Sequence, residues 1–398
     1  MRIATVNNYD NTIESLMQRQ STLTQTQQQM STGKRVNVAS DDPAAAAISE
    51  RAQAEQARIT ATQKAVAASN NAMTLTESAL GSAGSLLQTV RDTLVQAGNG
   101  SLQDADRSAL SQTLVGLRQQ LLTLSNSTDG SGNYLFGGQS ATQAPFSDTV
   151  GGVQYQGTPG VSQAAGNEGL PLSVDGSSAW MTARTGNGVF TAGASVSNGT
   201  AWIDSGKVTN PAQLTGATYS INFSVGGGST TYSILKNGAP TPQTNVAFST
   251  GQAVQIDGMS ATISGSPASG DSFTLAPSTP TLSVFGAIDK AIADLKTPNL
   301  SGAQRAQANS ENLANIDSSM NLLSAARSAA GATMNRISAV TDRLSALTVA
   351  SKTGQSNAED LDMTQAISDF NNQQTGYSAA LKAYSLVQHL SLFNYLSS

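Results

Sequence analysis

The chain has 398 residues, enough for two or three domains, and its formal net charge of −5, from 21 Lys and Arg against 26 Asp and Glu, predicts no nucleic-acid partner. It contains no cysteine, which excludes disulfides and thiolate sites, and no run of about 18 apolar residues, so we expect no membrane partner. The first residues, MRIATVNNYDNT, contain no apolar segment, and we expect no cleaved signal peptide.

The first predicted element is a helix over residues 6–30. Its stripe residues recur three and four positions apart, as at the a and d positions of a coiled coil, and two of the eight are polar. They are Val6, Tyr9, Ile13, Leu16, Gln20, Leu23, Gln27 and Met30. Gly33 suits the left-handed conformation that commonly follows the last residue of a helix.

A polar run followed by proline predicts the start of the second helix, because its side chains can accept the free N–H groups and proline fits the first helical position. This helix cap consists of Ser40, Asp41, Asp42 and Pro43. The following stripe predicts a helix over residues 43–98, roughly 80 Å long. A Gly-Asn-Gly stop at 98–100 separates it from a third helix over 101–125.

The pattern changes after residue 130, where about 140 residues are rich in Gly, Ser, Thr and Ala. Apolar residues now alternate with polar ones, and Asn237-Gly238 and Asp257-Gly258 are hairpin signals. We expect an antiparallel β insert over 146–280, with Trp180 and Trp202 in its core or on its surface.

A helical period returns near residue 281. It predicts a short helix over 282–295, a long helix over 302–352 that ends at Thr353-Gly354, and a terminal helix from residue 363. The terminal helix carries the same narrow stripe as the first one. Its members include Met363, Ile367, Phe370, Gln374, Tyr377, Leu381 and Tyr384.

These elements predict a mainly α fold with a central antiparallel β domain, in which the N- and C-terminal long helices form a shared coiled-coil-like bundle. We expect terminal assembly helices over 1–40 and 361–398. A helical bundle domain would comprise 41–145 and 281–360, and the variable β-rich insert 146–280.

Chemical function finds no support in the residues. His389 is the only histidine, and no nucleophile and base pattern or metal-ligand spacing accompanies it. The Gly226-Gly227-Gly228 run lies between strand patterns and predicts a turn. We therefore expect no enzyme activity, no catalytic residues, no cofactor and no metal.

The two end helices instead predict assembly. A narrow stripe on a helix rich in Gln, Ser and Thr buries little by itself, so we expect these helices to be largely disordered in a monomer and to fold against neighbouring copies. An intramolecular coiled coil or bundle core is the alternative interpretation of the same stripes.

The Ser31–Val36 run STGKRV and the Ser40–Ala46 run SDDPAAA resemble the N-terminal signature of the flagellin superfamily, in the branch of hook–filament junction proteins. The Tyr134–Gly138 run, the Leu390–Leu396 run and, in the insert, Ile256–Met259 and Gly270–Thr274 are also similar to that branch. The likeness covers both helical ends and is patchy in the insert.

This resemblance implies an extracellular flagellar protein, exported without a cleaved signal, that forms a ring with copies of itself at the hook–filament junction. The implied partners are hook-associated protein 1, flagellin and an export chaperone at the C-terminal helix. Filament-forming flagellin is the alternative within the superfamily. An adhesin-like role of the β insert is a second alternative.

Overall fold

A computed structural model describes residues 2–140, 142–166, 168–196 and 199–396, with side chains described between residues 10 and 386. The chain divides into two compact units. Unit 1 comprises residues 1–64 and 341–398, and unit 2 comprises residues 65–340. Both boundaries fall inside long helices, whereas the sequence placed the domain boundaries at the turns near residues 40 and 361.

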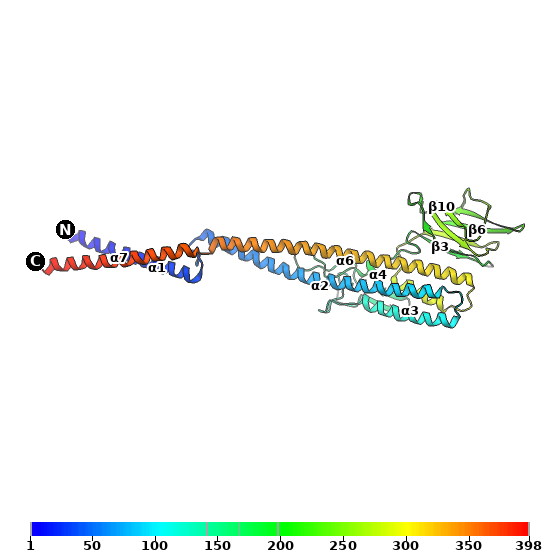
Figure 1. Ribbon diagram of the computed structural model, residues 1–398, viewed down its shortest axis with the longest axis horizontal. Helices are drawn as coiled ribbons and strands as arrows, with labels where there is room; N and C mark the ends of the chain where they lie inside the picture. The colour runs from blue at the N-terminus through cyan, green and yellow to red at the C-terminus, as the bar shows by residue number, and fades with distance from the viewer. Residues whose placement is uncertain (1, 141, 167, 197–198, 397–398) are drawn as a thin grey trace. The chain divides into compact units, whose positions relative to one another are not determined.

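Seven α-helices account for most of the described chain (Figure 1). They are α1 (Arg2–Thr32), α2 (Pro43–Ala97), α3 (Asp104–Ser125), α4 (Gly176–Trp180), α5 (Val284–Lys296), α6 (Gly302–Glu359) and α7 (Met363–Leu396). Gly33 follows α1 with φ of +70°, as its position in the sequence predicts. Because every long predicted helix is present and the central strands are antiparallel, the predicted fold class is confirmed.

Two helix ends differ from the prediction. Helix α6 continues through Thr353-Gly354 to Glu359, because side chains on both sides of the glycine are tied to α2. Ser351 donates to the Ala52 carbonyl, Oγ to O 3.0 Å. Helix α3 begins at Asp104 rather than at residue 101, because the Asp106 carboxylate accepts the Gln103 N–H and caps the start there.

The helical part of unit 2 is built on a continuous apolar core. Helix α3 packs against α5, and α2 and α6 run antiparallel, joined by the ion pairs Arg91–Asp317 and Arg327–Glu77. The largest buried side chains of the helices face this core. They include Leu80, Leu87, Leu94, Leu114, Leu121 and Phe285.

An aromatic cluster joins the segment before the β domain to this helical core. Trp180 stacks on Phe285 with ring centroids 5.7 Å apart, and Phe136 meets Trp180 edge-on at 5.5 Å. Phe146 also contacts both Trp180 and Phe285. The side chain of Trp180, expected in the insert, is thus fully buried in the helical part.

Twelve strands and one 3₁₀ turn (Pro211–Gln213) lie between α3 and α5 in the described part of the chain. The strands are β1 (Phe146–Thr149), β2 (Gly152–Tyr155), β3 (Phe190–Ser195), β4 (Trp202–Ile203), β5 (Lys207–Val208), β6 (Tyr219–Gly226), β7 (Ser229–Lys236), β8 (Ala239–Pro240), β9 (Val246–Ala247), β10 (Ala253–Ile256), β11 (Met259–Ser264) and β12 (Ser272–Pro277). All pairings between these strands are antiparallel, and the longest sheet has the order β3-β12-β6-β7-β8.

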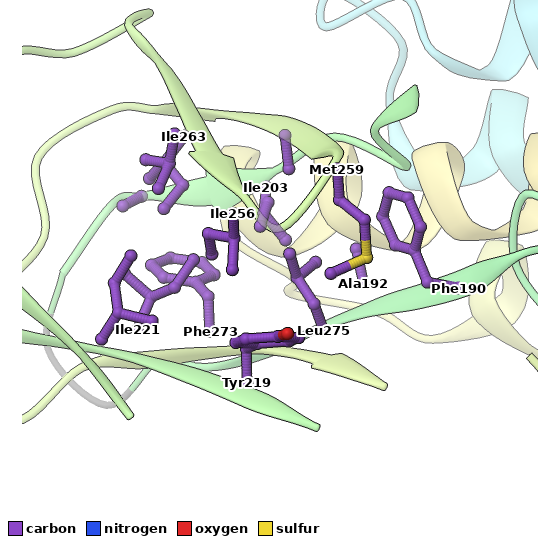
Figure 2. Packing of buried hydrophobic residues seen from close by; sticks show 14 of the residues in the cluster. Phe190, Ala192, Ile203, Tyr219, Ile221, Ile256, Met259, Ile263, Phe273 and Leu275 are labelled. Carbon is purple, nitrogen blue, oxygen red and sulfur yellow. The ribbon is translucent and has the colours of Figure 1, made fainter. Parts of the chain in front are cut away.

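Strands β3 to β12 enclose a core of their own between two sheets (Figure 2). Tyr219 and Phe273 of the longer sheet face Met259 and its neighbours on β10 and β11. Asn237-Gly238 and Asp257-Gly258 form the β7–β8 and β10–β11 turns with positive φ at both residues, as hairpin turns of this length require.

The β domain is therefore smaller than the insert predicted at 146–280. Its core residues lie between Phe190 and Leu275, whereas the segment from Phe146 to Ala183 packs with the helices. Thr185 donates its N–H to the Thr279 carbonyl at 3.0 Å, so the two ends of the β domain meet. The alternation of polar and apolar residues cannot separate the two groups of strands, because both have it.

Candidate assembly surfaces on the end helices

Helices α1 and α7 lie side by side and antiparallel in unit 1, so that the start of α1 and the end of α7 are at the same end of the pair (Figure 1). Three positions of each predicted stripe are half-buried in this contact, and we call them the shared row. The shared row consists of Leu16, Leu23 and Met30 on α1 and of Phe370, Tyr377 and Tyr384 on α7.

A second set of positions, which the sequence did not single out, completes the contact, and we call it the inner row. Thr26 and Ala366 are buried, and Gln373 and Ala380 are half-buried. The Thr26 hydroxyl donates to the Gln373 side chain, Oγ1 to Oε1 3.0 Å. A helix has 3.6 residues per turn, so one stripe of apolar spacing can be continued on either side by the next residue.

The remaining predicted positions are exposed, and we call them the outer row. Ile13 is 36% exposed, Ile367 47% and Leu381 43%. The whole row comprises Ile13, Gln20 and Gln27 on α1 and Met363, Ile367, Gln374 and Leu381 on α7. The side chains of Val6 and Tyr9, which belong to the predicted stripe, lie outside the described residues.

Exposed apolar side chains are concentrated in unit 1. Ten of the seventeen large apolar side chains that are exposed belong to it, although it holds less than a third of the residues. Besides the outer row they include Met17, Val38, Ile48, Leu347, Val349 and Leu386. Scattered single apolar residues are ordinary on a protein surface, but a concentration on one unit is typical of a surface that another protein covers.

The predicted cap residues serve different purposes. Asp42 is the residue that caps α2, because its carboxylate accepts the N–H groups of Ala44 and Ala45 at 3.1 and 3.0 Å, and Pro43 is the first residue of the helix. Asp41 accepts the N–H groups of two residues in the preceding loop. Ser40 is exposed.

A structural element that the sequence did not predict joins the four helices of unit 1, and we call it the joint. It consists of residues 33–36, between α1 and α2, and residues 359–361, between α6 and α7. Arg35 donates its N–H to the Glu359 carbonyl at 2.7 Å, and Leu361 donates its N–H to the Gly33 carbonyl at 2.9 Å. These bonds fix the end of α1 beside the start of α7.

The Glu359 carboxylate is the centre of the joint. It accepts hydrogen bonds from the Ser49 hydroxyl (2.7 Å), the Gln355 amide (2.8 Å) and the Lys34 ammonium group (3.0 Å). The Ser49 bond lowers the pKa of Glu359, burial opposes it, and Lys34 and Gln355 add to the lowering. From sequence, Glu359 was grouped with the acidic residues before α7, because its partners are about 300 residues away.

The described residues give no sign of catalytic or metal chemistry. Within them, no group of three or more His, Cys, Asp or Glu side chains could hold a metal ion. The side chain of His389 lies outside the described part. No described helix combines the length and apolar composition needed to cross a bilayer.

Comparison with known proteins decides the family. Residues 3–141 match the bacterial flagellin N-terminal helical region, and residues 313–396 match the C-terminal helical region. FlgL of Xanthomonas campestris is 30% identical, with 76% of this chain and 98% of that chain aligned at a TM-score of 0.65. The chain belongs to the bacterial flagellin family.

Relatives within the flagellin family extend the likeness over the whole chain. Flagellar hook-associated protein 3 of Salmonella typhimurium is 28% identical over 405 residues, which cover 99% of each protein. A structure of flagellar hook-associated protein 3 from Legionella pneumophila covers 85% of this chain and 99% of its own, with 26% identity and a TM-score of 0.66. The two flagellin-family regions contain α1 and α7, and hence all three rows described above.

Proposed function

We propose that this chain is a structural junction protein of the bacterial flagellum, which adapts the hook to the flagellin filament. The relatives that align over most of the chain are named hook-associated protein 3 or FlgL, and one is described as a flagellar junction protein. In this role it would form a ring with its own copies, contact hook-associated protein 1 on one side and receive flagellin on the other.

The observation that carries the proposal is the exposed outer row. The inner and shared rows already satisfy the contact between α1 and α7, so the apolar side chains of the outer row remain available to neighbouring subunits. The glutamines of that row can form hydrogen bonds across the interface and so restrict the register of the partners. Selective contacts suit a protein that meets different neighbours on its two sides.

Substitution in the outer row tests this assembly surface. Leu381→Asp places a charge on the row and should prevent incorporation into the flagellum, because a charge buried without a partner is costly. Ala379→Asp introduces the same charge at an exposed position of α7 outside the three rows, and should leave motility intact. Equal incorporation of the two variants, measured by immunogold labelling of isolated flagella, would contradict the proposal.

Deletion of the gene distinguishes the junction role from that of a filament subunit. We expect hooks without filaments and flagellin released into the medium. Purified protein at high concentration should form no long filaments in negative-stain microscopy. Long filaments would instead identify the chain as a flagellin.

Export and folding on assembly extend the proposal. We propose that an export chaperone protects α7 before secretion, since its outer row is apolar and exposed. We further propose that α1 and α7 gain most of their stability on assembly, because half-buried stripes offset little of the ordering cost. Hydrogen exchange on the dilute monomer tests this: strong protection throughout both helices would disprove it.

A further inference from the structure

The structure buries the less apolar side of each end-helix stripe. On α7 the outer row contains Met363, Ile367 and Leu381, but the helix pair buries the opposite side, with its alanines and Gln373. On α1 the pair buries Thr26 and leaves Ile13 exposed. Burial of apolar area alone would favour the opposite rotation of both helices, so another interaction must select this one.

We propose that Thr26 and Gln373, together with Arg19 lying over Gly376, fix the rotation of α1 and α7 about their own axes and thereby keep the outer row exposed. We call this set the rotation lock. Its consequence for assembly rests on the function proposed above. Its effect on the helix pair concerns the single chain and does not depend on that function.

The polar contact of the lock is specific in geometry. Thr26 is only 8% exposed, and its hydroxyl lies 3.0 Å both from Gln373 Oε1 and from the Thr22 carbonyl oxygen. In the opposite rotation the hydroxyl and the amide would no longer face each other. A polar pair inside a helix–helix contact selects one arrangement at some cost in stability, as buried asparagines do in coiled coils.

The steric contact lies farther along the pair. Arg19 Nη1 is 3.1 Å from the position that a Cβ on Gly376 would occupy, so a larger residue there would displace the guanidinium group. Glycine is unfavourable in the middle of a helix, by about 1 kcal/mol relative to alanine. Its presence is explained if α7 must leave room for this side chain.

The joint leaves rotation as the main freedom that the lock must restrict. The backbone bonds between Gly33 and Leu361 and between Arg35 and Glu359 hold the adjoining ends of the two helices side by side. A slip along the axis would break these bonds, whereas a rotation of each helix would exchange the inner for the outer row. The lock and the joint thus control different motions.

Alkylation of single introduced thiols measures the rotation directly, because the natural chain has no cysteine. Ala380→Cys probes the inner row and Leu381→Cys the outer row, at neighbouring positions of one helix. In the monomer we expect the thiol at 381 to react with a maleimide about tenfold faster than the thiol at 380, since partial burial slows the reaction. Circular dichroism of each protein monitors the helix content.

The lock is removed by combining Thr26→Val with Gln373→Met, which keeps the size of both side chains. The ratio of the two alkylation rates should then fall to about two or invert, because the apolar outer row turns inward. Thr24→Val with Thr375→Val changes two exposed threonines of the same helices and should preserve the tenfold ratio. A preserved ratio in the lock variant with unchanged helix content would overturn the proposal.

A second variant covers the case in which the first loses its helices. Gly376→Leu crowds Arg19 but improves the helix propensity of α7, so the helices should persist while the ratio falls. A tenfold ratio in Gly376→Leu would likewise refute the lock. If the ratio falls but incorporation into flagella is normal, the lock stands and the proposed assembly surface fails; a constant ratio with the Leu381→Asp defect gives the reverse result.

Discussion

Glu359 offers the sharpest test of the joint. Glu359→Gln keeps the size of the side chain and one acceptor for the buried Ser49 hydroxyl, but it turns an NH₂ group toward Lys34 or Gln355, both of which are donors. The substitution therefore removes at least one of the three hydrogen bonds and places donors against each other. We expect the joint to open more easily, with the rest of each unit little affected.

The contacts set the size of the effect. A hydrogen bond to a charged group contributes about 1.5–3 kcal/mol when its partners are buried. The Lys34 side chain is 44% exposed, so solvent screening reduces its ion pair to at most about 1 kcal/mol. With the Ser49 bond retained, the expected loss is about 2 kcal/mol, equivalent to roughly 30-fold in the equilibrium for opening.

Amide hydrogen exchange reads this opening at the joint itself. The N–H groups of Arg35 and Leu361 are bonded across the joint and should exchange roughly 30-fold faster in Glu359→Gln. Glu55→Gln is the matched control, because Glu55 pairs with Arg58 on the exposed side of α2 and should change exchange by less than about threefold. Equal exchange at the joint in the two variants would show that the carboxylate does not hold it.

The pH dependence, the aromatic cluster and the β domain give three further predictions. Because the folded-state pKa of Glu359 is lowered, its contribution is complete above the unfolded value near 4.5 and is lost as the pH falls through the folded value; joint opening, corrected for intrinsic exchange, should rise below about pH 4.5 in the natural chain and much less in Glu359→Gln. Phe285→Ala should destabilise unit 2 by about 3–5 kcal/mol in urea unfolding, since it empties the contact with Trp180, whereas Val225→Ala on the exposed β6–β7 hairpin should change it by less than about 0.5 kcal/mol. Deleting residues 186–278, so that Thr185 is joined to Thr279, should leave the helical circular dichroism and most motility intact, while a deletion from residue 150 should lose the folded unit because it removes Trp180; equal helix content in the two deletions would contradict the assigned boundary.

Local signals predicted much of the fold. Gly33, the Asp-Asp-Pro run and the two Xaa-Gly hairpins act within a few residues, so α1, α2 and the β7–β8 and β10–β11 turns follow from sequence alone. The heptad spacing likewise identified the shared rows of α1 and α7. The missed end of α6 shows the limit of such signals, because contacts with α2 outweigh the weak helix propensity of Gly354.

The sequence by itself determined the helical ends, the β-rich centre and the stripe that each end helix carries, since these depend on spacing along one segment. Only the tertiary structure decided which side of the stripe is buried, that Glu359 joins four helices, and that Trp180 belongs with the helical core. Each of these depends on a partner distant in sequence: Gln373 for Thr26, Lys34 and Ser49 for Glu359, and Phe285 for Trp180. A residue's spacing defines what it can contact, but the choice among possible contacts requires the partner's position in space.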